Sequence, residues 1–127
     1  MRRSLLLGLV LLGSLVACSS STGYGGGGGS GNSNGGMPGA NQVFLQNIAF
    51  TPATRTVAVG TTVEWVNQDG ITHTVTKDSG PGAAFDSGNL GSGGTFSVRF
   101  DSAGTYQYHC RIHGAPGSGM HGTVVVQ

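Results

Sequence analysis

The sequence contains few charged residues. Lys and Arg together number 6, and Asp and Glu 5, in a chain of 127 residues with a formal net charge of +1. Two of the cations, Arg2 and Arg3, stand at the very start, so the remainder is close to neutral. Proteins that bind nucleic acid through its phosphates carry a basic patch or stripe. This sequence has no such cluster, and we expect no nucleic-acid partner.

Long hydrophobic runs are also missing, apart from a short one near the start. Met1-Arg2-Arg3 precedes an apolar run from Leu5 to Leu12, which is too short to cross a bilayer as a helix. A basic start, a short apolar core and small residues before a cleavage site are typical of a secretory signal peptide. The pattern predicts a signal peptide over residues 1–17 and an exported protein.

Cysteine is scarce, with only 2 in the chain, Cys18 and Cys110. Leu15-Val16-Ala17-Cys18 resembles the bacterial lipoprotein signature, in which the Cys thiol is acylated and becomes the new N-terminus. The resemblance implies a lipid anchor on Cys18 that holds the protein to a membrane of the cell envelope. The alternative is an ordinary cleaved signal with Cys18 incidental. Once Cys18 is acylated, Cys110 is a lone thiol in an oxidising compartment, where it is a disulfide partner, a reactive group or a ligand.

Glycine, serine and asparagine dominate the stretch that follows Cys18. Such a composition buries too little apolar surface to offset the entropy of ordering the chain. We therefore predict that residues 18–42 form the acylated Cys and a disordered linker, and that residues 43–127 form one folded domain.

No part of this domain shows a helical apolar stripe, whereas period-two alternation recurs. Phe96, Val98 and Phe100 alternate with polar residues, and Tyr106, Tyr108 and Cys110 do the same. Further candidate strands are Val57 to Val59, Thr61 to Asn67, Thr72 to Thr76 and Gly122 to Gln127. Many short strands separated by Gly-rich turns predict an all-β, two-sheet sandwich or barrel.

The same alternation sorts the residues around Cys110. Cys110 has the parity of Tyr106 and Tyr108, so its side chain is expected to point into the sandwich. His109 has the opposite parity, and we exclude it from the inward-facing site.

Four residues form a candidate metal-ligand set. Cys110, His113 and Met120 follow one another closely, and His73 lies in a β-type run upstream. Two imidazoles and one thiolate in a near-trigonal plane, with a thioether at longer range, are the ligands of a blue-copper electron-transfer site. Thiolate and imidazole also suit zinc, but the thioether favours copper.

Several segments together resemble a plastocyanin-type cupredoxin. They include Val63 to Asn67, His73 to Thr76, Phe85 to Leu90, Gly104 to Cys110 and Gly119 to Val126. The resemblance implies a cupredoxin-like Greek-key β-sandwich that binds one copper ion and carries electrons between larger redox partner proteins. It also implies His73, Cys110 and His113 as equatorial ligands and Met120 as the axial ligand, in a protein expected to be a monomer.

The sequence departs from this family at two positions. Six residues separate His113 from Met120, a longer gap than in plastocyanins and amicyanins, and the adjacent His121 is the alternative axial ligand. Thr74 follows His73, where many members have Asn, so the link between the two ligand segments is expected to differ.

Two other functions compete with electron transfer. A multicopper enzyme would use His109, next to the thiolate, for a second copper, but only His109 and His121 remain unassigned, too few for a second catalytic centre. A copper carrier or sequestration module would favour an exposed cluster of Met and His, which the sequence lacks. We therefore expect a non-enzymatic electron carrier, with the copper-carrier function as the alternative.

Overall fold

The computed structural model describes residues 36–127, and the predicted signal peptide and Cys18 lie outside these residues. The strands are β1 (Gln42–Gln46), β2 (Ala49–Thr51), β3 (Thr54–Val57), β4 (Thr61–Asn67), β5 (Thr76–Ser79), β6 (Thr95–Phe100), β7 (Gly104–Ala115) and β8 (Ser118–Val126). The described residues contain no helix long and apolar enough to cross a membrane.

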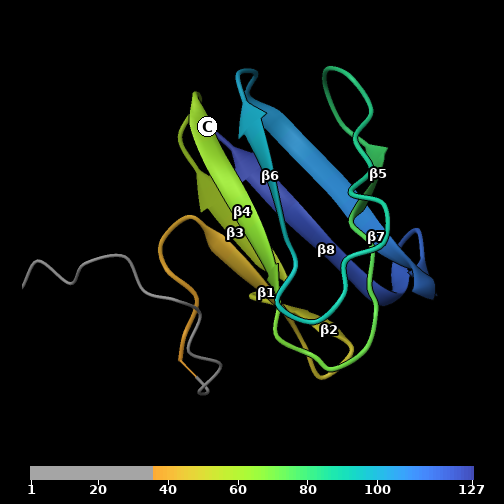
Figure 1. Cartoon of the computed structure of the whole chain (residues 1–127). Coiled ribbons are helices and arrows are strands. Elements are labelled where there is room, and N and C mark those ends of the chain that lie inside the picture. Colours follow the sequence, from red (N-terminus) through yellow and green to blue (C-terminus); the bar gives the residue numbers. More distant parts are fainter. Residues whose placement is uncertain (1–35) are drawn as a thin grey trace, which may run out of the picture. The chain divides into compact units, whose positions relative to one another are not determined.

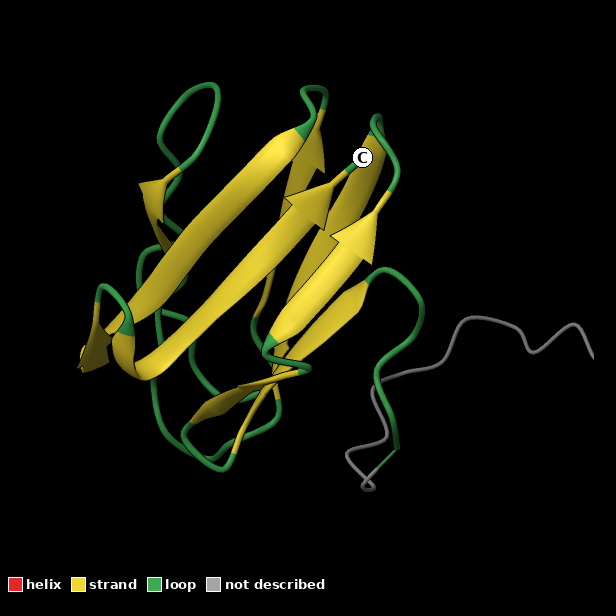
Figure 2. Cartoon of the chain, turned by 180° about the vertical axis from the view of Figure 1, so that it is seen from behind, coloured by secondary structure: helices red, strands yellow, loops and turns green. Residues whose placement is uncertain are grey.

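These strands form two sheets that face each other (Figures 1 and 2). One sheet has the order β2-β1-β4-β6 and the other β3-β8-β7-β5. Each contains one parallel pair, β1 with β4 and β3 with β8, and antiparallel pairs otherwise. The prediction of an all-β sandwich is confirmed.

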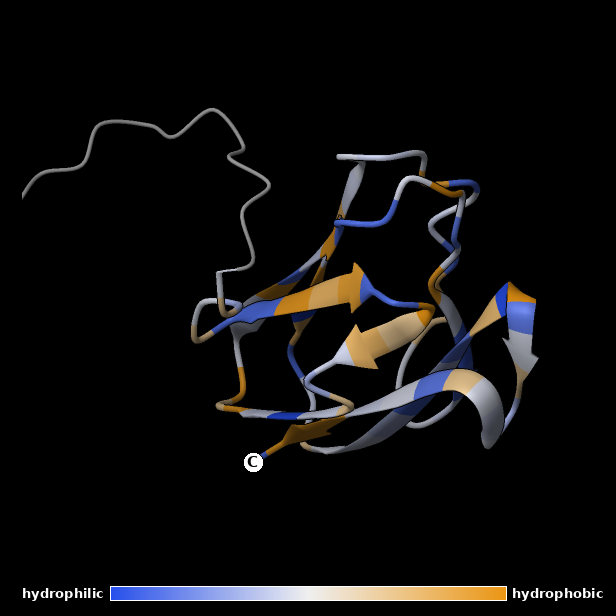
Figure 3. Ribbon diagram, turned by 90° about the horizontal axis from the view of Figure 1, so that it is seen from below, coloured by the Kyte–Doolittle hydropathy of each residue, from blue (hydrophilic) through white to orange (hydrophobic). Residues whose placement is uncertain are grey.

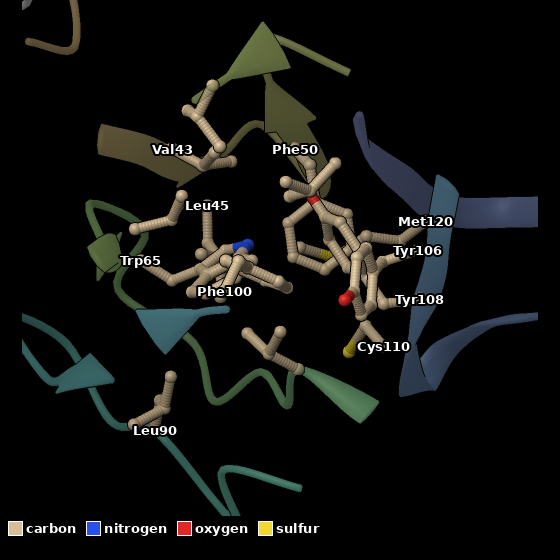
Figure 4. Packing of buried hydrophobic residues seen from close by; sticks show 14 of the residues in the cluster. Val43, Leu45, Phe50, Trp65, Leu90, Phe100, Tyr106, Tyr108, Cys110 and Met120 are labelled. Atoms are coloured by element: carbon tan, nitrogen blue, oxygen red, sulfur yellow. The ribbon is translucent and has the colours of Figure 1, made fainter. Parts of the chain in front are cut away.

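Alternating side chains build the core between the sheets. Figure 3, which views the molecule from below, shows hydrophobic and hydrophilic residues alternating along the strands. Trp65 of β4 is fully buried, and its ring packs edge-on against Tyr108 of β7 at a centroid distance of 5.4 Å. Figure 4 shows Cys110 and Met120 on the same side of the core as Tyr108. The strands that carry these sulfur atoms are thus part of the packed interior.

Some strand boundaries differ from those predicted. The strand predicted from Val57 to Val59 instead ends at Val57, because the chain turns at Gly60, whose φ is +87°. The strand predicted over Thr72 to Thr76 begins only at Thr76, and His73 forms an isolated bridge with Leu90. Strands β1 and β2 lie outside the predicted set, because each is short and lacks a long alternating pattern.

The segment after Cys110 is also more regular than predicted. The alternating pattern predicted a strand only as far as Cys110 and a further strand only from Gly122. The structure instead continues β7 to Ala115 and returns directly in β8. This correction matters because a hydrogen-bonded hairpin holds ligands more rigidly than an open loop.

Gly122 of β8 supplies a test of the packing between the hairpin and the core. A Cβ atom at this position would lie 2.6 Å from the Tyr108 hydroxyl oxygen and the ring carbon that bears it. Because the Tyr108 ring is fully buried, it has little room to move away. Gly122→Ala should destabilise the fold by roughly 1–3 kcal/mol in denaturant unfolding.

Gly91→Ala is the matched control, since a Cβ there meets nothing within 4 Å. Equal stability of the two variants would contradict the packing assigned to Tyr108.

Candidate metal centre

Three side chains converge at one end of the sandwich. Donor atoms of His73, Cys110 and His113 all lie within 4.8 Å of one another. His73 Nδ1 is 3.0 Å from His113 Nδ1, and Cys110 Sγ is 3.8 Å and 3.7 Å from these two nitrogens. The point equidistant from the three atoms is about 2 Å from each, close to the 2.0–2.3 Å bonds that imidazole and thiolate make to zinc. One transition-metal ion therefore fits among them.

Cys110 reaches this point because of its place on β7. It follows Tyr106 and Tyr108 on the inward face, and all three side chains are buried. The backbone N–H of Thr74 donates a hydrogen bond to the sulfur at 3.3 Å. A donor aimed at sulfur stabilises the thiolate form, which is the form that binds metals.

A register shift in the β7–β8 hairpin brings His113 and Met120 to the same place. His109 pairs with His121, but the next pair is Gly114 with Gly119. Residues 110–113 of β7 thus stand opposite Met120 alone. Such an excess of residues on one strand bends it and re-aims its side chains. The shift leaves Ile112 exposed and turns the Nδ1 atom of His113 toward Cys110.

Glycine is required on both sides of this irregular hairpin. A Cβ on Gly114 would lie 2.6 Å from the backbone nitrogen and oxygen of Met120. Gly119 has a φ of +61°, and its Cβ would lie 2.7 Å from the carbonyl oxygen of His113. The two strands approach each other this closely only because both positions lack a side chain.

The two candidates for a fourth ligand face different ways. Met120 is buried in the same core cluster as Cys110 (Figure 4). His121 is exposed on the other face of β8, where its Nδ1–H donates to the carbonyl oxygen of Gly119. Only the Met120 side chain lies on the face of the hairpin that carries Cys110.

His73 is held from both its backbone and its ring. Its N–H and C=O pair with Leu90, and the side chain is fully buried. The ring Nε2–H donates to Asp69 Oδ2 at 2.8 Å, which leaves Nδ1 facing His113. Partial burial raises the pKa of Asp69, but hydrogen bonds from the Ile48 and Asn47 N–H groups and from His73 outweigh this effect and lower the pKa below its ordinary value.

Thr74 links the two ligand-bearing segments. Its hydroxyl accepts a hydrogen bond from the N–H of Arg111 at 2.9 Å, while its own N–H points at Cys110. The resemblance led us to expect a different link here, because it implies Asn rather than Thr at this position. A threonine hydroxyl and backbone amide together connect the His73 segment to β7.

His109 lies outside the cluster. Its Nδ1 pairs with the carboxylate of Asp78 on β5, and neither residue contributes to the group of three donors. Cys18 lies outside the described residues.

Sequence reasoning missed Asp69. It precedes His73 by four residues in a segment without regular strand or helix, so no periodicity places the two side chains together. The one available signal was a carboxylate near a candidate ligand, since metal-binding histidines commonly donate their second N–H to such a group.

Comparisons with known proteins agree with this geometry. A family model described as copper binding proteins, plastocyanin/azurin family, matches residues 39–127. Plastocyanin of Scenedesmus fuscus is 38% identical over 88 residues, which cover 63% of this chain and 88% of that protein. Amicyanin-alpha of Methylorubrum extorquens is 37% identical over 92 residues, covering 70% of this chain and 73% of that protein.

Solved structures show the same fold. An oxidised amicyanin point mutant superimposes with a TM-score of 0.61 at 34% identity, over 70% of this chain and 83% of the other. A copper-containing nitrite reductase from Thermus scotoductus gives a TM-score of 0.62 at 29% identity. The match covers 72% of this chain but only 22% of the reductase, so the likeness is to one part of that enzyme.

Proposed function

Because this chain belongs to the plastocyanin/azurin family of copper-binding proteins and has copper as its cofactor, we propose that it shuttles single electrons between redox partner proteins in the cell envelope. When bound, copper supplies a one-electron couple between Cu(I) and Cu(II). The observation that carries the proposal is the triangle of His73 Nδ1, Cys110 Sγ and His113 Nδ1, with room for one ion at its centre.

Each proposed ligand has a distinct role. His73, Cys110 and His113 would hold the copper ion through the thiolate and two imidazoles, and Met120 would add a weak contact from within the core. A soft thiolate and thioether combined with imidazole suit copper in either oxidation state. His121 is not favoured as the axial ligand, because its ring is turned to the opposite face of β8.

The burial of the donors favours an electron carrier over an enzyme or a copper carrier. His73 and Cys110 are fully buried, and Met120 is 2% exposed. Donors buried to this degree leave little room for a substrate beside the ion and hinder exchange of the ion with another protein. An electron, by contrast, needs only a short route to the surface.

His113 provides that route in our proposal. It is the one partly exposed member of the donor triangle. Exposed apolar side chains lie on the segments around it: Ile112 is its neighbour on β7, and Ile48 and Ile71 flank Asp69 and His73. A small apolar surface around an electron exit allows brief docking with partners, since weak redox encounters use small interfaces.

The N-terminal residues determine where the protein works. We propose that residues 1–17 direct export and that acylated Cys18 anchors the domain, as a monomer, to a membrane through the linker ending at residue 42. The support is the signal-like pattern before Cys18 and the lipoprotein-like sequence Leu-Val-Ala-Cys.

Substitution of Cys110 tests the ligand set. Copper-loaded Cys110→Ser should lose the intense visible absorption that comes from charge transfer between thiolate and Cu(II), because serine supplies no sulfur. His109→Ala should keep it, since His109 pairs with Asp78 away from the donors. Visible and EPR spectra of the copper-loaded protein make the measurement, and a colourless wild type that binds zinc more tightly would overturn the copper assignment.

The same spectra distinguish the two axial candidates. Met120→Leu should shift the spectrum and the reduction potential, and His121→Ala should change neither. The reverse outcome would assign the axial position to His121.

A charge placed near His113 tests the electron exit. Ile112→Glu should slow electron self-exchange between copies of the protein by about tenfold or more. In self-exchange the His113 surfaces of two copies must come together, so the added carboxylates repel each other and lose their water. Val59→Glu is the matched control, because Val59 is 50% exposed and Ile112 is 51% exposed. Val59 lies at the other end of the sandwich, where its N–H donates a hydrogen bond to the carbonyl oxygen of Gln127. Exchange rates come from NMR line broadening, and equal slowing in the two variants would argue against the His113 exit.

Replacement of Cys18 tests the anchor. Cys18→Ser should move the protein from the membrane fraction to the soluble fraction after cell disruption, because serine is not acylated by this route. Mass spectrometry of the wild type should find lipid on the N-terminal Cys. An unmodified N-terminus would show that the signal is cleaved without acylation.

A further inference from the structure

The β1–β2 hairpin turns through two residues in an unusual conformation. Gln46 pairs with Ala49, and the intervening Asn47 and Ile48 have φ angles of +56° and +57°. Two-residue hairpins of this kind favour Asn followed by Gly, since both positions need φ > 0. A β-branched residue such as Ile48 is strongly disfavoured in this conformation. Some other contact must therefore hold the turn.

Asp69 supplies that contact. Its Oδ1 accepts the N–H of Asn47 at 2.8 Å, and its Oδ2 accepts the N–H of Ile48 at 3.0 Å. Oδ2 also accepts the Nε2–H of His73 at 2.8 Å. One carboxylate therefore joins the strained turn to the buried ring that faces the metal position.

Asp69 is itself fixed by a buried amide. The Asp69 N–H donates to Asn67 Oδ1 at 2.9 Å, and Asn67 Nδ2 donates to the carbonyl oxygens of Ile71 and Leu90. Asn67 is 1% exposed, so this arrangement is shielded from water. Leu90 pairs with the backbone of His73, which closes a loop of contacts around the ring.

We propose that Asp69 is a positioning residue that couples the Asn47-Ile48 turn to the copper ligand His73, fixing the tautomer of its ring. A carboxylate has no proton to donate, so the Nε2 atom of His73 carries the hydrogen and Nδ1 keeps the lone pair for the ion. The inference rests on the ligand role proposed for His73. The competing explanation is that Asp69 only stabilises the turn.

Asp69→Asn separates these explanations. The carboxylate offers two acceptor oxygens, whereas an amide offers one oxygen and one NH₂ group. An amide therefore cannot accept from all three N–H groups, because its NH₂ faces at least one of them. The amide no longer fixes the tautomer: the ring can still donate Nε2–H to the amide oxygen, or it can accept from the NH₂ group at Nε2 and carry its hydrogen on Nδ1, which cannot then bind a metal. We expect the copper affinity to fall by about 10–100-fold, the effect usual for an outer partner of a metal-binding His.

The decisive measurement uses the metal-free protein. For the neutral ring, the ¹⁵N shifts of His73 should report hydrogen on Nε2 in the wild type and a shifted tautomer equilibrium toward Nδ1 in Asp69→Asn. Asp101→Asn is the control, because it removes the same charge from an exposed pair with Arg99. A wild-type His73 with hydrogen on Nδ1, or an Asp69→Asn protein with unchanged tautomer and copper affinity, would overturn the proposal.

Ile48→Gly separates the turn from the ligand. Glycine adopts φ > 0 without strain, so Ile48→Gly combined with Asp69→Asn should recover much of the thermal stability that Asp69→Asn loses. It should not recover the tautomer or the copper affinity. Recovery of all three would mean that Asp69 acts only through the turn.

The double variant also keeps the test available if Asp69→Asn alone fails to fold. Failure of the copper assignment itself would appear separately, as a wild type without thiolate-to-copper absorption but with the His73 tautomer unchanged.

Discussion

The metal centre depends on one irregularity in the β7–β8 ladder. Regular alternation along β7 would direct Cys110 inward and His113 outward, because the two are three residues apart. The four residues 110–113 oppose a single residue, Met120, and this excess brings both donors to the same side. Gly114 and Gly119 allow the strands to remain in contact beyond the irregularity. Without this change of register, the thiolate and the second imidazole would lie on opposite faces of the sheet.

Cys110 and Met120 belong to the packed core, and this gives the site its rigidity. Cys110 follows Tyr108, which packs against Trp65, and Met120 is buried in the same cluster. Protein interiors are packed at the density of organic crystals, so such side chains have little room to move. Donor positions that stay constant when the charge of the ion changes reduce the reorganisation that accompanies electron transfer. In the proposed electron carrier, the sandwich would therefore contribute to function through the same contacts that stabilise the fold.

The sequence predicted those parts of the molecule that follow local patterns. Period-two alternation located β4 and β6, and the residue types near Cys110 identified a donor set of which three members converge in the structure. Contacts between distant segments were not predictable in this way. The bridge between His73 and Leu90 depends on backbone pairing across the chain, and the role of Asp69 depends on a turn about twenty residues upstream. The register shift in the hairpin required glycines whose neighbours only the fold reveals.

The segment from Asp69 to Thr74 acts on the site in two opposing ways. The Thr74 N–H withdraws negative charge from the sulfur of Cys110, which favours the less positive, reduced state of a bound ion. The Asp69 carboxylate lies behind the ring of His73 and favours the more positive, oxidised state. Both groups are held by hydrogen bonds to other segments, Thr74 to Arg111 and Asp69 to the β1–β2 turn. A short stretch without regular secondary structure thus carries two groups that would act in opposite directions on the reduction potential of a bound copper ion.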